Sequence, residues 1–332
     1  MRADITPADA RHIREPEAGG RIVSLLASAT EIVCDLGLED RLVGISHECD
    51  HPARILDRPR LSRPRFDPAR LTSGELDRAV RDAMAEHRSV YEIDADALAR
   101  LAPDLILTQA ACEVCAVPTA GVREIVRDAG LATRILSLDA HTLEEIVESI
   151  EAIGTAAGAG RRAAELRAAW EARLEAVARV VGEAPRPRVL SIEWLDPPFT
   201  PGHWVPQMIE LAAGVCLAGE AGAPSREARW GDLAELDPDV LIVMPCGYGL
   251  EASRRDADRF GRELLGIAPR AIEDGRAFVV DGSSYFNRSG PRVVTGVEIL
   301  AGLLHPALAP PPPPGTAEPW SPAERREATT AT

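Results

Sequence analysis

The feature that most constrains this chain is a long helical pattern between two strand-rich halves. Over residues 141–181, apolar residues recur at i, i+3 and i+4, which is typical of amphipathic helices. Thr142 followed three residues later by Glu145 predicts a capping box, and Gly158 and Gly160 predict a break between two helices. Unbroken, the segment would be about 60 Å long, which is enough to cross from one domain to another.

Short apolar strands alternate with helices on both sides of this pattern. The first half has strands near 21–26 and 41–46, and the second half starts with one near 185–194. A helix, a Pro-Asp pair and a buried strand follow in the same order in ALARLAPDLILTQ (97–109) and in DLAELDPDVLIVMP (232–245). The alternation predicts parallel sheets covered on both faces. The recurrence predicts an α/β protein of two similar lobes joined by a long α-helix.

The pattern also predicts where the parts of the chain begin and end. We expect a disordered arm over 1–20, which is polar and has no periodicity. An N-terminal α/β lobe follows over 21–140, then the connecting helices over 141–182 and a C-terminal α/β lobe over 185–306. The segment 307–332 starts with a run of prolines and ends in small and charged residues, which predicts a disordered tail.

Charge and composition exclude several classes of function. The net charge is −15, with 52 acidic and 37 basic residues, so the chain lacks the basic surface that nucleic acids or anionic membranes require. No lysine is present, which excludes a P-loop lysine and a Schiff-base lysine. Motifs of serine hydrolases, zincins and dinucleotide-binding enzymes are absent as well. We therefore expect a monomeric binding protein rather than an enzyme.

The N-terminus carries charged residues where the apolar core of a signal peptide would lie. No run of about 18 apolar residues occurs, so no transmembrane helix is expected. As written, the sequence predicts a cytoplasmic protein. If the true start lies upstream, a periplasmic or extracytoplasmic protein is expected instead.

An ordered set of segments resembles a known family over about residues 21–306. These segments are RIVSLLASATEIVCDLG, LVGISHECDHP, LAPDLILTQ, EWLDPPFTPGHWVPQMIELAAG, LDPDVLIVMP and YFNRSGPRVVTGVEIL. The chain is similar to the cobalamin-binding proteins of ABC importers. It also resembles the wider class III substrate-binding proteins for corrinoids, siderophores and haem. The resemblance implies two Rossmann-like lobes joined by a rigid helix, with the ligand held in the cleft between them.

Ligands of parallel sheets bind beyond the carboxyl ends of the strands, so the loops at these ends are the candidate site. Aromatic residues are only 4% of the chain, yet several fall in these loops, among them Phe199, Trp204 and Tyr285. A flat macrocycle needs apolar faces above and below it and a few polar groups at its rim. Alternatively, the aromatic rings fill gaps beneath the loops.

The resemblance and the strand-end rule together give a set of expected ligand contacts. Phe199 and Arg288 align with ligand-contact positions of the cobalamin binders, and Tyr285 stands where an aromatic residue is expected. Ser284, Gln109 and Glu48 differ from the residues found there in a family member. The full predicted set is His47, Glu48, Cys49, Tyr91, Gln109, Cys112, Phe199, His203, Trp204, Ser284, Tyr285 and Arg288.

Thiol and imidazole groups near the same strand ends leave a second interpretation open. Cys112 and Cys115 form a C-x-x-C pair, and Cys49 and His47 follow a neighbouring strand. Such groups can hold zinc or an iron–sulfur cluster, or act in redox chemistry. They can equally be plain residues of the cleft, or contact a bound cofactor. His47 or His203 could also be an axial ligand to corrinoid cobalt.

The resemblance further implies an acidic residue on each lobe that docks to a membrane permease. The aligned position in the first lobe is Asp96, and in the second lobe Asp232 lies beside the aligned position. Asp96 could instead cap a helix. The leading hypothesis is thus a protein that binds cobalamin or a related corrinoid, for ABC-type uptake or intracellular cofactor handling. The alternatives are a metal- or redox-active protein using the Cys/His cluster, and a ferric siderophore or haem binder.

Overall fold

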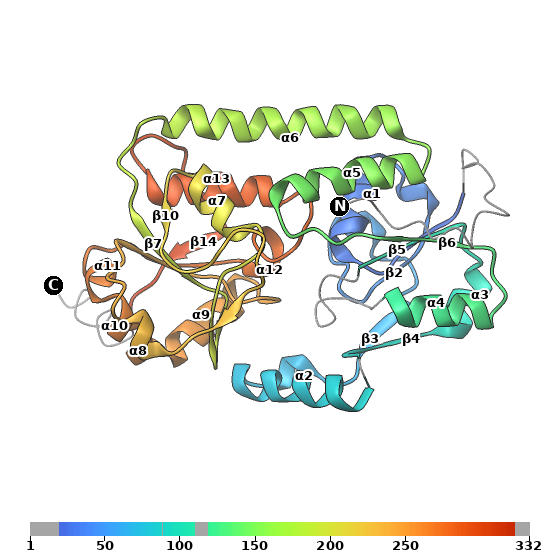
Figure 1. The fold of residues 1–332 in the computed structure, drawn as a ribbon, viewed down its shortest axis with the longest axis horizontal. Coiled ribbons are helices and arrows are strands. Elements are labelled where there is room, and N and C mark those ends of the chain that lie inside the picture. The colour runs from blue at the N-terminus through green and yellow to red at the C-terminus, as the bar shows by residue number, and fades with distance from the viewer. Residues whose placement is uncertain (1–19, 88, 110–118, 323–332) are drawn as a thin grey trace.

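A computed structural model describes residues 20–87, 89–109 and 119–322 of the chain. Two α/β lobes lie side by side, and one long helix runs along one edge of both (Figure 1). The expected fold class is confirmed: each lobe is built around a largely parallel sheet, and a long helix joins the two.

The N-terminal lobe is built around a four-stranded parallel sheet in the order β2-β1-β5-β6. Its central strands, β1 and β5, are fully buried, as expected for β-branched and leucine-rich runs covered on both faces. The edge strand β6 is only half-buried. The strands and helices of this core are β1 (Ile22–Ser24), α1 (Ala27–Asp35), β2 (Leu42–Ile45), α3 (Ala95–Leu101), β5 (Leu105–Thr108), α4 (Thr119–Asp128) and β6 (Arg134–Ser137).

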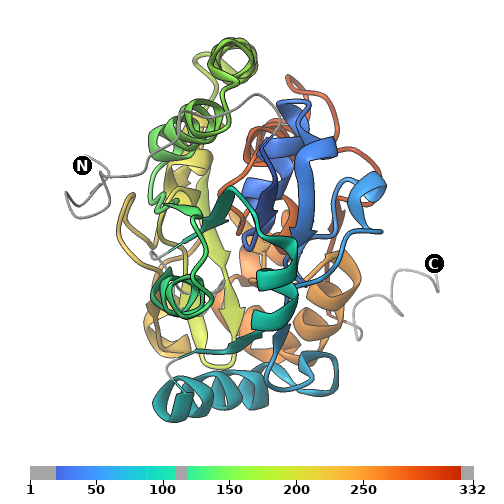
Figure 2. The ribbon, with the colours of Figure 1, turned by 90° about the vertical axis from the view of Figure 1, so that its right-hand side faces the viewer.

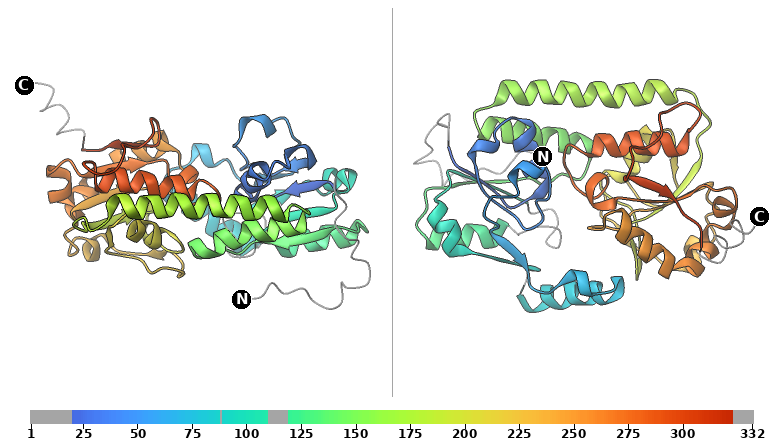
Figure 3. Two further views of the ribbon diagram at one scale, coloured as in Figure 1. Left: turned by 90° about the horizontal axis from the view of Figure 1, so that it is seen from above. Right: turned by 180° about the vertical axis from the view of Figure 1, so that it is seen from behind.

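The connection between the lobes consists of α5 (Leu143–Ala156) and α6 (Gly160–Val181). The capping box of Thr142 and Glu145 is confirmed, and so is the break between the helices. The two helices pack tightly at Gly154, where an added Cβ would lie 2.4 Å from the Cβ of Ala163. Seen from above, α6 extends over both lobes and connects them (Figure 3).

The C-terminal lobe has a five-stranded sheet in the order β10-β7-β12-β13-β14, parallel except for β14. Helix α13 is buried almost all round, because it lies between this sheet and α6. The elements of this sheet and its helices are β7 (Arg188–Ile192), α7 (Val205–Leu211), β10 (Val215–Cys216), α8 (Trp230–Leu233), β12 (Val240–Val243), α9 (Leu250–Arg259), α10 (Gly261–Ile267), α11 (Pro269–Glu273), β13 (Ala277–Val280), α12 (Gly282–Tyr285), α13 (Val293–Leu304) and β14 (Ala317–Pro319). A small antiparallel sheet adds β8 (Trp194–Leu195), β9 (Pro198–Thr200) and β11 (Arg226–Glu227).

The expectation of a disordered tail from residue 307 is wrong for residues 307–322. This segment turns back over α13 and adds β14 to the edge of the sheet. Gly302 allows the close approach, because a Cβ there would lie 2.4 Å from the carbonyl oxygen of Pro310. The indole of Trp320 is 3% exposed and donates a hydrogen bond to Asp258 at 2.8 Å. Proline suits an edge strand because it has no amide to donate, so a proline-rich run need not be disordered.

Helix α2 (Ser73–His87) reaches from the N-terminal lobe to the C-terminal lobe. It is carried by a two-stranded antiparallel sheet of β3 (Ser62–Pro64) and β4 (Tyr91–Ile93) and lies below both lobes (Figures 1 and 2). Its Ser73 hydroxyl donates to Asp256 at 3.3 Å, and Arg81 pairs with Glu227 at 3.1 Å. The lobes are therefore joined on the side of the molecule opposite α6 as well.

Within the described residues, no helix is both long and apolar enough to cross a membrane.

Candidate functional site

A cavity lies where the carboxyl ends of the two parallel sheets face one another. Its lining comes from the loops after β1, β2, β5 and β6 in one lobe, and after β7, β12 and β13 in the other. The lining residues are Leu25, Leu26, Ala27, Ser28, Ser46, Glu48, Gln109, Ala140, Glu193, Gly202, His203, Trp204, Val205, Ser225, Cys246, Phe286, Asn287, Arg288 and Ser289. The strand-end rule thus predicted the position of the cavity. Its volume is about 140 Å³, which is smaller than most ligand pockets.

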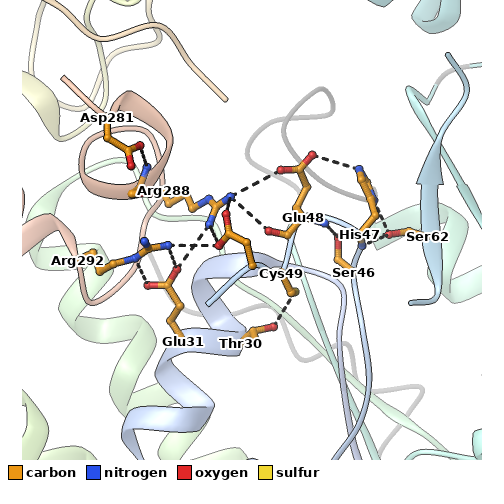
Figure 4. Close-up of polar contacts among 12 residues, drawn as sticks. Thr30, Glu31, Ser46, His47, Glu48, Cys49, Ser62, Asp281, Arg288 and Arg292 are labelled. Carbon is orange, nitrogen blue, oxygen red and sulfur yellow. Dashed lines mark hydrogen bonds and ion pairs between the residues drawn. The ribbon is translucent and has the colours of Figure 1, made fainter. Parts of the chain in front are cut away.

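Ion pairs clasp the two lobes at the edge of this cavity (Figure 4). Arg288, from the loop after α12, donates to both carboxylate oxygens of Asp50 at 2.6 and 3.0 Å. Arg292 makes a second bidentate pair with Glu31 on α1, at 2.6 and 3.0 Å. These four residues form the interlobe clasp. Because the cavity is small while the clasp holds, a large ligand requires the clasp to open.

The clasp shifts the pKa of the acids around it. Burial alone would raise the pKa of Asp50, but the hydrogen bonds and charge of Arg288, with the charge of Arg292, lower it below its ordinary value. The hydrogen bond from His47 lowers the pKa of Glu48, and Arg288 adds to this effect. Acids with lowered pKa values stabilise the folded protein above their ordinary pKa, and this stabilisation is lost as the pH falls. The Asp50 carboxylate is therefore ionised at neutral pH, where its ion pair with Arg288 stabilises the contact between the lobes.

The cavity lining also includes Glu193, which directly follows β7. Its side chain is buried, and one carboxylate oxygen accepts a hydrogen bond from the Ser225 hydroxyl at 2.6 Å. The backbone amide of Gly202 also donates toward this carboxyl. Gly202 has no room for a side chain, because an added Cβ would lie 2.3 Å from the backbone nitrogen of Ser225. Burial raises the pKa of Glu193 to about 7, against these two hydrogen bonds.

The raised pKa of Glu193 predicts a pH-dependent stability. An acid with a raised pKa in the folded state stabilises the protein fully below its unfolded value of 4.5, and this contribution is lost as the pH rises through about 7. Between pH 5 and pH 8 the wild type should therefore lose roughly 2–3 kcal/mol of unfolding free energy relative to Glu193→Gln. Urea unfolding of both proteins at the two pH values measures this difference. Parallel pH profiles would contradict it.

Two of the predicted residues, His203 and Trp204, form the floor of the cavity in the C-terminal lobe. Their rings stack with centroids 5.7 Å apart, and the indole of Trp204 donates to the carbonyl oxygen of Phe286 at 2.7 Å. His141, just before α5, lies 5.3 Å from His203 between ring centroids. Burial, and then the nearness of His141, lowers the pKa of His203. The Nδ1 atom of His203 is buried without a hydrogen-bond partner among the described residues.

Of the expected ligand contacts, Glu48, Gln109, His203, Trp204 and Arg288 line the cavity. The remaining described members lie outside its lining, for local reasons given below.

Three of these residues belong to the N-terminal lobe. The His47 ring turns toward β3 and β4, where it meets the Ser62 hydroxyl at 2.8 Å and the Tyr91 ring at 4.9 Å between centroids. Cys49 is 1% exposed and its sulfur lies 3.0 Å from the hydroxyl of Thr30. His47 and Cys49 thus anchor the loop that carries Glu48, although they lie outside the cavity lining.

The other three belong to the C-terminal lobe. Phe199 lies in β9. In the small antiparallel sheet it stands opposite Trp194 of β8 and Glu227 of β11. The guanidinium of Arg292 lies over the ring of Tyr285, with its Cζ atom 5.7 Å from the ring centroid. The backbone amide of Ser284 donates to Asp281, which caps α12.

A metal or redox site gains no support from the described residues. No group of three or more His, Cys, Asp or Glu side chains there could hold a metal ion. Burial raises the pKa of Cys49 to about 11, which keeps its thiol protonated. Cys112 and Cys115 lie outside the described residues.

Sequence reasoning missed Glu193, Ser225 and Asn287 as residues of the cavity wall. Glu193 directly follows an apolar strand, the position that the strand-end rule singles out, and this signal could have found it. Asn287 lies in the same loop as the predicted Arg288, so the strand-end rule could have found it as well. Ser225 had no comparable signal, because its loop reaches the cavity only through the tertiary fold.

Comparison with known proteins decides the family. The model of the periplasmic binding protein family matches residues 22–263. The chain belongs to this family. Among relatives of this periplasmic binding protein, a vitamin B12-binding protein of Vibrio cholerae is 25% identical over 298 residues, covering 88% of this chain and 91% of the relative. An uncharacterized ABC transporter substrate-binding lipoprotein of Bacillus subtilis is 24% identical, covering 91% of this chain and 84% of the relative.

Solved structures agree on the two-lobed fold of this periplasmic binding protein. The periplasmic vitamin B12 binding protein of Vibrio cholerae superposes with a TM-score of 0.62 at 21% identity, covering 86% of this chain and 97% of the other. A periplasmic heme binding protein of Pseudomonas aeruginosa gives 0.63 at 22% identity, covering 91% and 95%. These structures show the fold, and the family match shows that the chain is a periplasmic binding protein. The family is periplasmic, so the expectation of a cytoplasmic protein is not supported.

Proposed function

We propose that this periplasmic binding protein binds cobalamin or a related corrinoid in the cleft between its lobes, without catalysis, for uptake by an ABC importer. The observation that carries the proposal is a cavity to which the carboxyl ends of both sheets contribute. The vitamin B12-binding relative, which matches most of the chain, supports the corrinoid as ligand. A haem or ferric siderophore is the second candidate, because a heme binding protein shares the fold.

The cleft offers the groups that a corrinoid needs. Trp204 and His203 give a flat ring surface on one lobe, and Gln109 and Glu48 give polar groups on the other. Most of the affinity would come from the burial of the macrocycle's apolar faces, at about 25 cal/mol per Å². Nothing in this arrangement requires a bond to be made or broken.

Delivery to a permease would take place outside the cytoplasm and would use acidic residues on both lobes. Asp96, in the first turn of α3, and Asp232, in α8, are both exposed. Asp94 rather than Asp96 caps α3, which leaves the Asp96 carboxylate without a role in capping. Asp232 pairs with Arg229 at 3.0 Å, so docking at this site would exchange this arginine for a basic residue of the permease.

The direct test is a titration of the purified protein with aquocobalamin and with dicyanocobinamide, followed by calorimetry and by the visible spectrum. We expect saturable binding to one site with a dissociation constant of about 1 μM or below, which corresponds to about −8 kcal/mol. Competition with hemin and with a ferric siderophore reports the preference. Retention of hemin with no retention of either corrinoid would instead assign the protein to the second candidate function.

A further inference from the structure

Glu193 is a buried acid in the cavity wall, and no described residue places a cation beside it. Its carboxyl is held by two neutral donors, the Ser225 hydroxyl at 2.6 Å and the backbone amide of Gly202. A carboxylate has about four lone-pair sites for hydrogen bonds, so acceptor capacity remains for a further donor. A buried carboxylate is costly unless it is paired or hydrogen-bonded. The ligand is the natural source of that further donor, because Glu193 lines the cavity.

The charged residues of the cavity lining also favour a ligand with neutral hydrogen-bond donors over one with carboxylates. Among the described lining residues, Glu48 and Glu193 are the carboxylic acids and Arg288 is the guanidinium. Both carboxylate oxygens of Asp50 already engage Arg288, at 2.6 and 3.0 Å. His203 has a lowered pKa, so its imidazole is neutral at pH 7. Above about pH 7, where Glu193 is mostly ionised, a ligand that carries carboxylates would therefore meet a negative charge at Glu193 and no uncommitted cation among these residues.

We propose that Glu193 is a specificity-determining residue: it accepts hydrogen bonds from neutral amide groups on the rim of the ligand and rejects rims that carry carboxylates. Two like charges in a dry site repel strongly, whereas an amide N–H beside a carboxylate makes a charge-assisted hydrogen bond. Discrimination of this kind uses both an attractive and a repulsive element. The inference rests on the proposed function and deepens it, because the rim of a cobalamin corrin carries amides while haem carries two propionates.

Two pairs of matched ligands distinguish the effect of the rim groups on affinity from the effect of the macrocycle. Cobyrinic acid and its heptaamide share one corrin ring and differ only in carboxylates against amides. Iron protoporphyrin and its diamide make the same comparison on a porphyrin. The proteins are the wild type, Glu193→Gln, and Glu235→Gln as a control that removes an equal charge from an exposed position on the same lobe. Glutamine has nearly the same shape as glutamate and can bond Ser225 and Gly202, so the variant should fold, which a melting curve checks.

The measurement is the ratio of amide-rim to acid-rim affinity at pH 8, where most of Glu193 is ionised. We expect the wild type to prefer the amide form at least tenfold, and Glu193→Gln to reduce this ratio about tenfold, while Glu235→Gln leaves it unchanged. A ratio near one in the wild type, or one that Glu193→Gln does not alter, overturns the inference but leaves corrinoid binding intact. Binding of the porphyrin pair alone, with a preference for the diamide that Glu193→Gln reduces, overturns the proposed function and supports the role of Glu193. Binding of none of the four ligands overturns both.

Discussion

Replacing Arg292 with leucine is expected to open the cleft of this protein. The Glu31 carboxylate, whose side chain is 4% exposed, would lose its bidentate partner and keep only Arg288 at 3.7 Å. Removal of one partner of a buried ion pair costs about 3–5 kcal/mol, because the remaining charge stays desolvated. Glu31 and Arg292 belong to different lobes, so separation of the lobes hydrates Glu31 and relieves this cost. The closed form should therefore be lost while each lobe stays folded.

Small-angle scattering measures the opening as an increase in the radius of gyration, and circular dichroism verifies that the lobes remain folded. Arg173→Leu is the matched control, because its pair with Glu298 joins α6 and α13 on the surface at 2.7 Å. An exposed pair of this kind contributes about 0–1 kcal/mol. The double variant Glu31→Gln with Arg292→Leu should regain part of the closed form. An unchanged radius of gyration in Arg292→Leu would show that the clasp does not hold the lobes.

Replacing Trp320 with alanine should cost the C-terminal lobe about 3–5 kcal/mol of unfolding free energy, as large-to-small changes of buried tryptophan do. The indole is 3% exposed and packs in the core between the sheet and helices α9 to α11. Its loss also leaves the Asp258 carboxylate without the hydrogen bond from the indole N–H at 2.8 Å. Urea unfolding followed by circular dichroism measures the change.

Leu308→Ala is the control for this prediction, because Leu308 lies in the same segment and is 54% exposed. Substitutions at such exposed positions usually change stability by less than about 0.5 kcal/mol. If Trp320→Ala were as mild as Leu308→Ala, the tail would not be part of the folded lobe.

The sequence predicted the architecture because the period of its apolar residues is local information. The capping box at Thr142 and the break near Gly158 were visible in the same way. The strand-end rule placed Glu48 and Trp204 at the cavity, because parallel strands bring all their carboxyl ends to one edge.

Other features depend on tertiary contacts that no local pattern carries. Phe199 lies outside the cavity lining because two short antiparallel strands redirect the loop after β7. The pairs of Arg288 and Arg292 across the lobes join residues more than 230 positions apart, as between Arg288 and Asp50 at a separation of 238. Residues 307–322 are held by the pairing of β14 with β13 and by Trp320, which reaches the core beyond a proline run.

The most direct measurement of where the ligand binds is amide hydrogen exchange with and without a saturating corrinoid. Ligand held between the lobes should slow exchange in segments of both, around residues 46–48 in the N-terminal lobe and around 202–205 and 286–289 in the C-terminal lobe. Saturable binding with protection confined to one lobe, or to a surface away from these segments, would contradict a shared interlobe site.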